Sequence, residues 1–267
     1  MSRESIADAS RPNAGRIYDY TLGGNHNFEV DRQAAEQLFK ILPFIPKHAR
    51  LQRWALKDIA MELSERRGFD LIIDFASGLP TNDHIHTNVT RATTVIYSDF
   101  DPVVVEYARE ILGDTPKVYV FQADARRPEE LLNRPEVQRI LAGRRKAGFI
   151  YWGVSAFLDN ESIAHAMSYL YDWADAGSCL VFNAQGGSSI GTPEEQERVV
   201  KIYEQMGIKL HGRTLEELEE LLKPWRLDKD GFVSLLDWHG LDQPELVEEY
   251  TRHFGALAGT YGAYLIK

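Results

Sequence analysis

The sequence has few of the features that place a protein outside the cell or in a membrane. Among 267 residues there is one cysteine, Cys179, so an intrachain disulfide is impossible. No apolar run approaches the roughly 20 residues that a membrane-spanning helix needs. The opening segment, 1–8, is polar and lacks the apolar stretch of a secretory signal. We therefore expect a cytoplasmic protein with no membrane span.

Positive charge is also scarce. Lys and Arg number 30 against 40 Asp and Glu, which gives a formal net charge of −10 and a pI of about 5.3. An acidic chain repels phosphate backbones, so we expect no nucleic-acid partner. Hydrophobic residues make up 44% of the chain, which is enough to fill the core of one compact domain and excludes a disordered chain.

Short apolar runs alternate with helical patterns through most of the chain. Such a run, about four to eight residues long, is typical of a buried parallel strand. The runs are 69–75, 92–100, 117–124, 147–154 and 178–184, and the segments 225–238 and 259–267 are also strand-like. Strands that alternate with helices predict an α/β fold with a mostly parallel sheet.

The N-terminal part has a different pattern. Two helical segments, 31–42 and 47–67, precede the first strand, and Gly68 ends the second of them. We therefore divide the chain into an N-terminal helical extension, 1–67, and a core, 68–267, that together form one compact unit.

Small residues follow the first predicted strand, at the edge where ligands bind in open α/β sheets. Asp74 lies near the end of this strand. Ala76, Ser77 and Gly78 let the backbone turn sharply and approach a ligand closely. An ordinary strand-to-helix turn would explain them equally well. The segment does not match the G-x-G-x-x-G fingerprint of dinucleotide sites, which argues against a bound pyrophosphate.

Acidic residues follow the second and third predicted strands. Asp99 lies 21 residues beyond Gly78, close to the spacing at which nucleoside-binding folds place the acid that accepts from ribose hydroxyls. Asp101 is expected to cap the helix that begins at Pro102. Asp124 can accept from an amino group such as that of adenine, or can cap a helix. Together these positions predict a pocket for an adenosine-like ligand.

Two further segments have polar or glycine residues in suggestive positions. His84 and His86 follow the turn and are expected to begin a helix, and positions two apart on a helix do not face one site. We therefore expect no metal. The glycine-rich segment 185–191, after the fifth strand, fits a mobile lid over the acceptor and an ordinary loop equally well.

Four blocks of sequence resemble one known family. They are RIYDYTLGGNHNFEVDRQAAEQL (16–38), DFASGLPTN (74–82), YSDFDPVVVEYAR (97–109) and FQADAR (121–126). The chain resembles the class I S-adenosylmethionine-dependent methyltransferases, and more closely the S-adenosyl methyltransferase family formerly known as a domain of unknown function. The N-terminal block is its most specific part. The resemblance implies a Rossmann-like, mostly parallel seven-stranded sheet with an antiparallel last strand.

The resemblance also implies which residues bind the cofactor, S-adenosyl-L-methionine. They are Tyr18, Tyr20, Gly24, Asn25, Asp74, Ala76, Ser77, Gly78, Asp99, Phe100, Asp124, Ala125, Trp152 and Gly153. Two positions depart from the family pattern. Ala76 replaces a common glycine, and the segment 154–157 reads VSAF where relatives often have a histidine.

The implied activity is transfer of a methyl group from S-adenosyl-L-methionine, which becomes S-adenosyl-L-homocysteine, to a small-molecule acceptor. Methyl transfer from a sulfonium needs mainly alignment, so we assign no catalytic residue. A non-catalytic protein that binds S-adenosylmethionine or S-adenosylhomocysteine would have the same residues. An NAD(P)-dependent oxidoreductase fits less well, because the dinucleotide fingerprint is missing.

Overall fold

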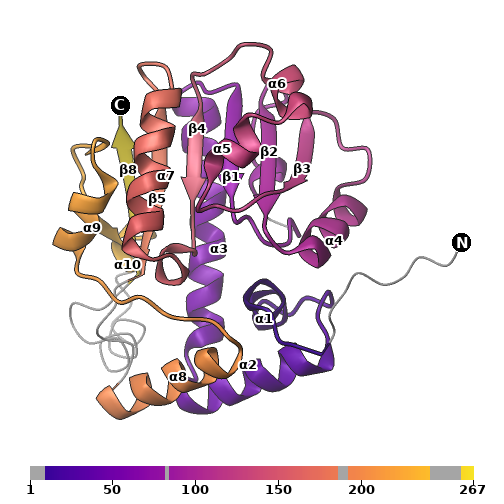
Figure 1. Cartoon of the computed structure of the whole chain (residues 1–267), viewed down its shortest axis with the longest axis vertical. Coiled ribbons are helices and arrows are strands. Elements are labelled where there is room, and N and C mark those ends of the chain that lie inside the picture. The colour runs from indigo at the N-terminus through magenta and orange to yellow at the C-terminus, as the bar shows by residue number, and fades with distance from the viewer. Residues whose placement is uncertain (1–9, 82–83, 186–191, 241–259) are drawn as a thin grey trace, which may run out of the picture.

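A single mixed sheet forms the centre of the molecule (Figure 1). The computed structural model describes residues 10–81, 84–185, 192–240 and 260–267. Within them the strands follow the order β3-β2-β1-β4-β5-β8-β6, with β7 also paired to β8. The strands are β1 Leu71–Phe75, β2 Thr94–Asp99, β3 Val118–Gln122, β4 Gly148–Tyr151, β5 Cys179–Gln185, β6 Arg226–Leu227, β7 Val233–Ser234 and β8 Thr260–Ile266. β1 to β5 are parallel, and β8 runs antiparallel to β5.

The α/β prediction is confirmed, with an antiparallel last strand as expected. The sheet has eight strands rather than seven, because the segment 225–238 divides into two short strands and a helix, α10 Leu235–Trp238. Gly231, with φ 64°, closes a turn on Asp228 between the two strands. A glycine adopts this left-handed conformation without steric cost, so the turn interrupts what the sequence presents as one strand-like segment.

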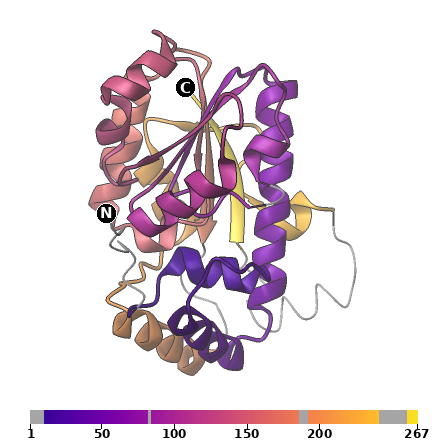
Figure 2. The ribbon, with the colours of Figure 1, turned by 90° about the vertical axis from the view of Figure 1, so that its right-hand side faces the viewer.

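Helices cover both faces of the sheet (Figure 2). They are α3 Ile45–Met61, which continues as a π-helical turn Glu62–Arg66, α4 Pro102–Leu112, α5 Pro128–Leu132, α6 Pro135–Leu141, α7 Asn160–Trp173 and α9 Leu215–Leu222. Neighbouring strand residues point to opposite faces. Thus Ile72 belongs to the core cluster that includes residues of α3, whereas Ile73 belongs to the cluster that includes Met167 of α7. No helix in the described part of the chain is long and apolar enough to cross a membrane.

A further group of helices lies beyond the carboxyl ends of the parallel strands (Figures 1 and 2). It consists of α1 Ala14–Thr21, α2 Glu29–Ile41 and α8 Pro193–Gln205. The long helix α3 begins beside this group and runs along the sheet to the start of β4, where Leu63 packs against Gly148. A Cβ at Gly148 would lie 3.0 Å from Leu63, so this glycine permits the close approach. The segment 186–191, where a lid was considered, lies outside the described residues.

A buried ion cluster attaches the extension to the sheet. Arg16 of α1 contacts Asp31 of α2 at 2.8 Å through Nε and Asp101 at 3.4 Å through a terminal nitrogen. Asn13 donates to the same Asp101 oxygen at 2.5 Å. The other Asp101 oxygen accepts from the N–H of Val103 at 2.8 Å, which confirms Asp101 as the cap of α4. Asp101 therefore binds the N-terminal extension through one oxygen and caps α4 beside the sheet through the other.

Replacing Arg16 with Met should destabilise the protein strongly. The change leaves the fully buried Asp31 without its cation, and breaking a buried pair in this way costs about 3–5 kcal/mol. Urea unfolding followed by circular dichroism measures the loss. Arg32→Met is a matched control, because the Arg32–Glu29 pair is exposed and should contribute less than about 1 kcal/mol. Similar losses for the two variants would contradict the anchoring role of Arg16.

Candidate active site

The turn after β1 is formed by Ala76, Ser77 and Gly78, which we call the glycine turn. Ala76 has φ 52° and Gly78 has φ 64°, so both are left-handed. The N–H of Ser77 donates to the carbonyl oxygen of Ser98 at 2.9 Å, and the N–H of Gly78 donates to Asp99 Oδ2 at 3.1 Å. The turn and the predicted ribose acid are thus joined directly, as expected from their position on neighbouring strands.

Asp99 is held at the end of β2 with both oxygens oriented. Besides the bond from Gly78, its Oδ1 accepts from the N–H of Asp101 at 3.0 Å. Burial raises the pKa of Asp99 to about 6, although these backbone bonds act in the opposite direction. Each carboxylate oxygen has a second lone pair that can accept from a ligand hydroxyl. Phe100, the next residue, is 61% exposed and presents its ring to the surface.

An acid and a guanidinium, Asp74 and Arg53, lie buried beside the glycine turn. Asp74 of β1 is 2% exposed, and no described residue donates a hydrogen bond to its carboxylate. Burial raises the pKa of Asp74 well above its usual range, Arg53 opposes this, and Asp99 adds to it. Arg53 of α3 is 7% exposed, and its Nε and one terminal nitrogen have no hydrogen-bond partner within the described chain. Its guanidinium lies 5.5 Å from the ring centre of Tyr18.

The same helix lines the end of β4. Trp152 Nε1 donates to the carbonyl oxygen of Gln52 at 3.1 Å, and the N–H of Gly153 donates to Asn183 Oδ1 at 3.1 Å. The side-chain nitrogen of Gln52 is buried without a partner among the described residues. The hydroxyl of Tyr18 donates to the carbonyl oxygen of Ala49 at 3.1 Å. Residues from α1, α3 and β4 therefore meet above the strand ends.

The third predicted acid differs from the other two. Asp124 is bound by Arg126, whose Nε and terminal nitrogen lie 2.8 and 2.5 Å from Oδ2. Burial alone would raise the pKa of Asp124, but the hydrogen bonds from Arg126 outweigh it and lower the pKa. Ala125 is fixed through its carbonyl oxygen, which accepts from the hydroxyl of Tyr151 at 2.8 Å. Any ligand contact of Asp124 is therefore shared with a guanidinium.

The N-terminal block is organised by Asp19, which sequence reasoning missed. Asp19 is 4% exposed, and its Oδ2 accepts from the N–H of His26 at 2.8 Å and from Asn27 Nδ2 at 2.9 Å. Its carbonyl oxygen accepts from the N–H of Gly24 at 2.8 Å. A Cβ on Gly24 would lie 2.1 Å from Asp19 Oδ1. Gly24 thus makes room for Asp19, and the sequence signal is an acid followed by a glycine and asparagine turn.

Three residues predicted from this block, Tyr20, Gly24 and Asn25, make contacts within the N-terminal helices or lie exposed in the turn. Tyr20 donates to Glu36 of α2 at 2.8 Å and stacks on Phe39, because positions two apart on a helix point in nearly opposite directions. Asn25 is exposed in the turn, and Gly24 packs on Asp19. Their contact with the cofactor stays a prediction. From this block, Tyr18 is the predicted residue that reaches Arg53.

Arg53 and Gln52 were also missed, because neither belongs to a recognisable motif. A signal was present in the helical pattern. Both polar residues lie in the stretch of α3 where Leu51, Ala55 and Leu56 are buried. A charged residue on a buried helix face usually has a partner or a function.

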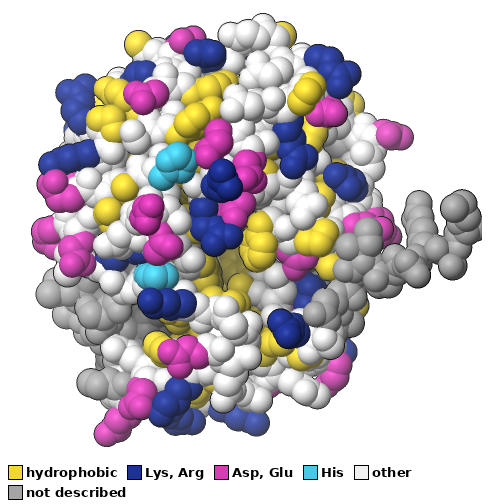
Figure 3. Space-filling view, in the orientation of Figure 1, with side chains coloured by type: hydrophobic (Ala, Val, Ile, Leu, Met, Phe, Trp, Pro, Cys, Tyr) yellow, Lys and Arg dark blue, Asp and Glu magenta, His cyan; other side chains and the backbone are white. Residues whose placement is uncertain are grey.

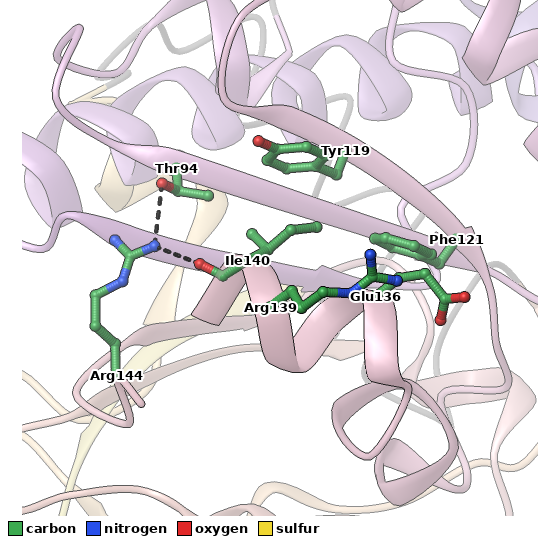
Figure 4. Close-up of a pocket in the computed structure, with 7 residues that line it drawn as sticks. All are labelled: Thr94, Tyr119, Phe121, Glu136, Arg139, Ile140 and Arg144. Carbon is green, nitrogen blue, oxygen red and sulfur yellow. Dashed lines mark hydrogen bonds between the residues drawn. The ribbon is translucent and has the colours of Figure 1, made fainter. Parts of the chain in front are cut away.

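The surface is hollowed beside the strand ends. Figure 3 shows a depression near the middle of this face, with hydrophobic side chains at its floor and charged side chains of both signs around it. A second hollow of about 570 Å³ lies between β3 and α6 (Figure 4). That hollow includes Thr94, at the start of β2, and its Arg144 already bonds to Thr94 Oγ1 and to the carbonyl oxygen of Ile140. It is therefore at the opposite end of β2 from the candidate site.

The sheet order, the reversed strand β8 and the acid at the end of β2 define the class I, Rossmann-like methyltransferase fold. Within that class, the chain belongs to the S-adenosyl methyltransferase family, whose model matches residues 1–261. The protein is therefore an S-adenosylmethionine-dependent methyltransferase.

Solved structures agree with this assignment. A candidate methyltransferase from Thermobifida fusca YX is 28% identical, with a TM-score of 0.84 over 97% of this chain and 96% of that chain. A DUF574 family protein from Streptomyces avermitilis MA-4680 is 25% identical, with a TM-score of 0.83 over 97% and 99%. The magnesium protoporphyrin IX methyltransferase of Synechocystis PCC 6803, with bound S-adenosylhomocysteine, shares the fold at 10% identity, a TM-score of 0.51 and coverage of 94% and 97%. No curated protein matches the sequence significantly.

Replacing Gly24 with Ala should break the turn around Asp19. The new Cβ would overlap Asp19 Oδ1, and overpacking of this kind costs about 3 kcal/mol. Gly23→Ala is a matched control: Gly23 has φ 83° but no atom within 4 Å of an added Cβ, so it should lose only the roughly 1–2 kcal/mol of backbone strain. Chemical unfolding measures both. Equal losses would contradict the role of Asp19 as the centre of the turn.

Proposed function

We propose that this protein transfers the methyl group of S-adenosylmethionine to a small-molecule acceptor, with the cofactor bound across the ends of β2, β1 and β4. The observation that carries this proposal is a pair of buried ionisable side chains, Asp74 and Arg53, of which Arg53 has two nitrogens without a hydrogen-bond partner among the described residues. A buried charge without hydrogen bonds costs several kcal/mol, so such groups usually meet a ligand. The amino-acid end of S-adenosylmethionine matches both residues, because its ammonium group can bind Asp74 and its carboxylate can bind Arg53.

Overall charge supports the same cofactor. Asp74 and Asp99 contribute two negative groups to the site when ionised, and Arg53 contributes one positive group. S-adenosylmethionine has a sulfonium, an ammonium and a carboxylate, which give it a net charge of plus one. The cofactor therefore neutralises the site, whereas a dinucleotide would add negative charge beside two carboxylates.

The adenosine end fits the neighbouring strand. Asp99 has a free lone pair on each oxygen for the ribose hydroxyls, and the glycine turn lets the backbone approach closely. Phe100 offers an exposed ring against which adenine can pack. The adenine would lie next to Asp124 and Ala125. Asp124 is paired with Arg126, and the carbonyl oxygen of Ala125 accepts a hydrogen bond from Tyr151.

The protein contributes alignment rather than a reactive group. When bound, the cofactor would supply a methyl group on a cationic sulfur, and in-line transfer of that methyl group to the acceptor would leave S-adenosylhomocysteine, a neutral thioether. Arg53 and Asp74 hold the amino-acid end, and Asp99 holds the ribose, so the reacting carbon is fixed between them. Trp152, Gly153 and Gln52 line the side beyond β4, from which an acceptor would approach.

The acceptor side is suited to a small molecule. Helices α1, α2 and α8 lie beyond the strand ends, on the side from which a large acceptor would have to approach. The net charge of −10 disfavours nucleic acid. Incubating the protein with S-adenosylmethionine and a metabolite library should release S-adenosylhomocysteine, and Asp99→Ala should suppress the release. Release with protein or nucleic acid alone would overturn the small-molecule assignment.

Truncating the ligand separates the two halves of the site. 5′-Methylthioadenosine keeps the adenosine group and lacks the amino-acid end. Arg53→Met should weaken binding of S-adenosylmethionine about 10- to 100-fold, the value of a charge-assisted hydrogen bond, and leave 5′-methylthioadenosine unchanged. Asp99→Ala should weaken both ligands. Isothermal titration calorimetry provides the four comparisons.

The outcome for Arg53 is decisive for the orientation of the cofactor. If Arg53→Met weakens both ligands equally, the amino-acid end does not lie at Arg53. If Asp99→Ala weakens neither ligand while the protein remains folded, the ribose does not lie at β2. Absence of S-adenosylmethionine binding by the unmodified protein would overturn the proposed function as a whole.

A further inference from the structure

Two buried side chains next to the site have no role in the proposed function. His84 precedes a short 3-10 turn, η2 Ile85–Thr87, and Tyr97 lies in β2 directly opposite Asp74 of β1. His84 is 1% exposed and Tyr97 is completely buried. Burying an imidazole and a phenol costs free energy unless their polar atoms are hydrogen-bonded.

All three polar atoms of these side chains have partners. His84 Nε2 lies 3.2 Å from the carbonyl oxygen of Ser77, which can only accept, so Nε2 is assigned the proton. His84 Nδ1 then accepts from the N–H of Ile85 at 2.9 Å and lies 3.0 Å from the hydroxyl of Tyr97. That hydroxyl accepts from the N–H of His86 at 2.8 Å. A neutral His84 therefore connects η2 and β2 to the glycine turn.

The surroundings keep this histidine neutral. Burial lowers the pKa of His84 well below its usual range, and the charge of Arg53 and the neighbouring His86 act in the same direction. Protonation would also place an N–H at Nδ1, opposite the N–H of Ile85. The donor at Nε2 is thus permanently available to Ser77.

The glycine turn needs such support because of Ala76. Its φ of 52° costs a residue with a side chain about 1–2 kcal/mol, and strain of this kind persists only where the surroundings hold it. Three hydrogen bonds hold the next two peptide groups: Ser77 donates to Ser98, His84 donates to Ser77, and Gly78 donates to Asp99. His84 supplies the one that comes from outside β2.

We infer that His84 is a positioning residue for the cofactor. It holds the glycine turn in its strained conformation by donating to the carbonyl oxygen of Ser77, and Tyr97 orients the imidazole ring. This inference rests on the proposed function, because it assumes that the glycine turn contacts S-adenosylmethionine. It also assigns a role to the His-x-His pattern: both imidazoles lie within 3.0 Å of the hydroxyl of Tyr97.

Variants of His84 test the inference through cofactor affinity. His84→Leu removes the donor to Ser77 and should raise the Kd of S-adenosylmethionine and of 5′-methylthioadenosine about tenfold. His84→Gln keeps an N–H donor at a similar reach and should restore most of the affinity. Ser178→Ala is the matched control, because Ser178 is a buried hydrogen-bonding residue at the start of β5. It should lower the thermal stability without changing either Kd.

A double substitution distinguishes positioning from general destabilisation. Ala76→Gly removes the strain, so the turn should depend less on His84, and Ala76→Gly/His84→Leu should bind S-adenosylmethionine more tightly than His84→Leu alone. If His84→Leu does not fold, Tyr97→Phe, which releases the imidazole but keeps the donor, should give a smaller loss that Ala76→Gly again reduces.

Two results would overturn the inference, and a third would refute the proposed function on which it rests. An unchanged Kd in folded His84→Leu, or in Tyr97→Phe where the former does not fold, would overturn the inference. Equal losses with and without Ala76→Gly would show that His84 supports the fold and not the turn, which also overturns it. A wild-type protein that does not bind S-adenosylmethionine would refute the proposed function instead.

Discussion

The buried contact between Arg16, Asp31 and Asp101 is the interaction on which the candidate site depends. One guanidinium joins α1 and α2 to the residue that caps α4, and Asp101 also donates its N–H to Asp99. Exposed ion pairs contribute little to stability, whereas removing one partner of a buried pair leaves an uncompensated charge and is strongly destabilising. The cluster therefore determines where the extension lies, and with it the position of Tyr18 over the strand ends.

The candidate site differs from the rest of the structure because its buried arginine, Arg53, lacks hydrogen-bond partners among the described residues. Arg67, directly after the π-helical turn that continues α3, is also partly buried, but it contacts Glu62 and Asp228 at 2.9 Å and covers the ring of Tyr264. Arg53 of α3 has a ring beneath it but no carboxylate within salt-bridge distance among the described residues. Buried polar groups without partners are usually found at functional sites, and this difference between Arg53 and Arg67 is the reason for placing the proposed cofactor at Arg53.

In the N-terminal block, residues 16–38, many of the polar residues stabilise the local fold. Asp19 gathers the backbone of Gly24 and His26 and the side chain of Asn27, so most of the polar residues in the block satisfy one another. The result is a rigid turn after α1. Its contribution to the site is indirect, because it fixes the helix from which Tyr18 extends toward Arg53.

The sequence alone predicts the five parallel strands, and it places the glycine turn and Asp99 at the ends of successive strands. These features are local, because a buried strand is encoded by a continuous apolar run and its turn by the residues that follow. The folded structure was needed to place Arg53 and Gln52 of α3 near the strand ends, to direct Tyr20 toward α2, and to pair Arg126 with Asp124. Such contacts depend on the rotation and packing of helices, which no short stretch of sequence specifies.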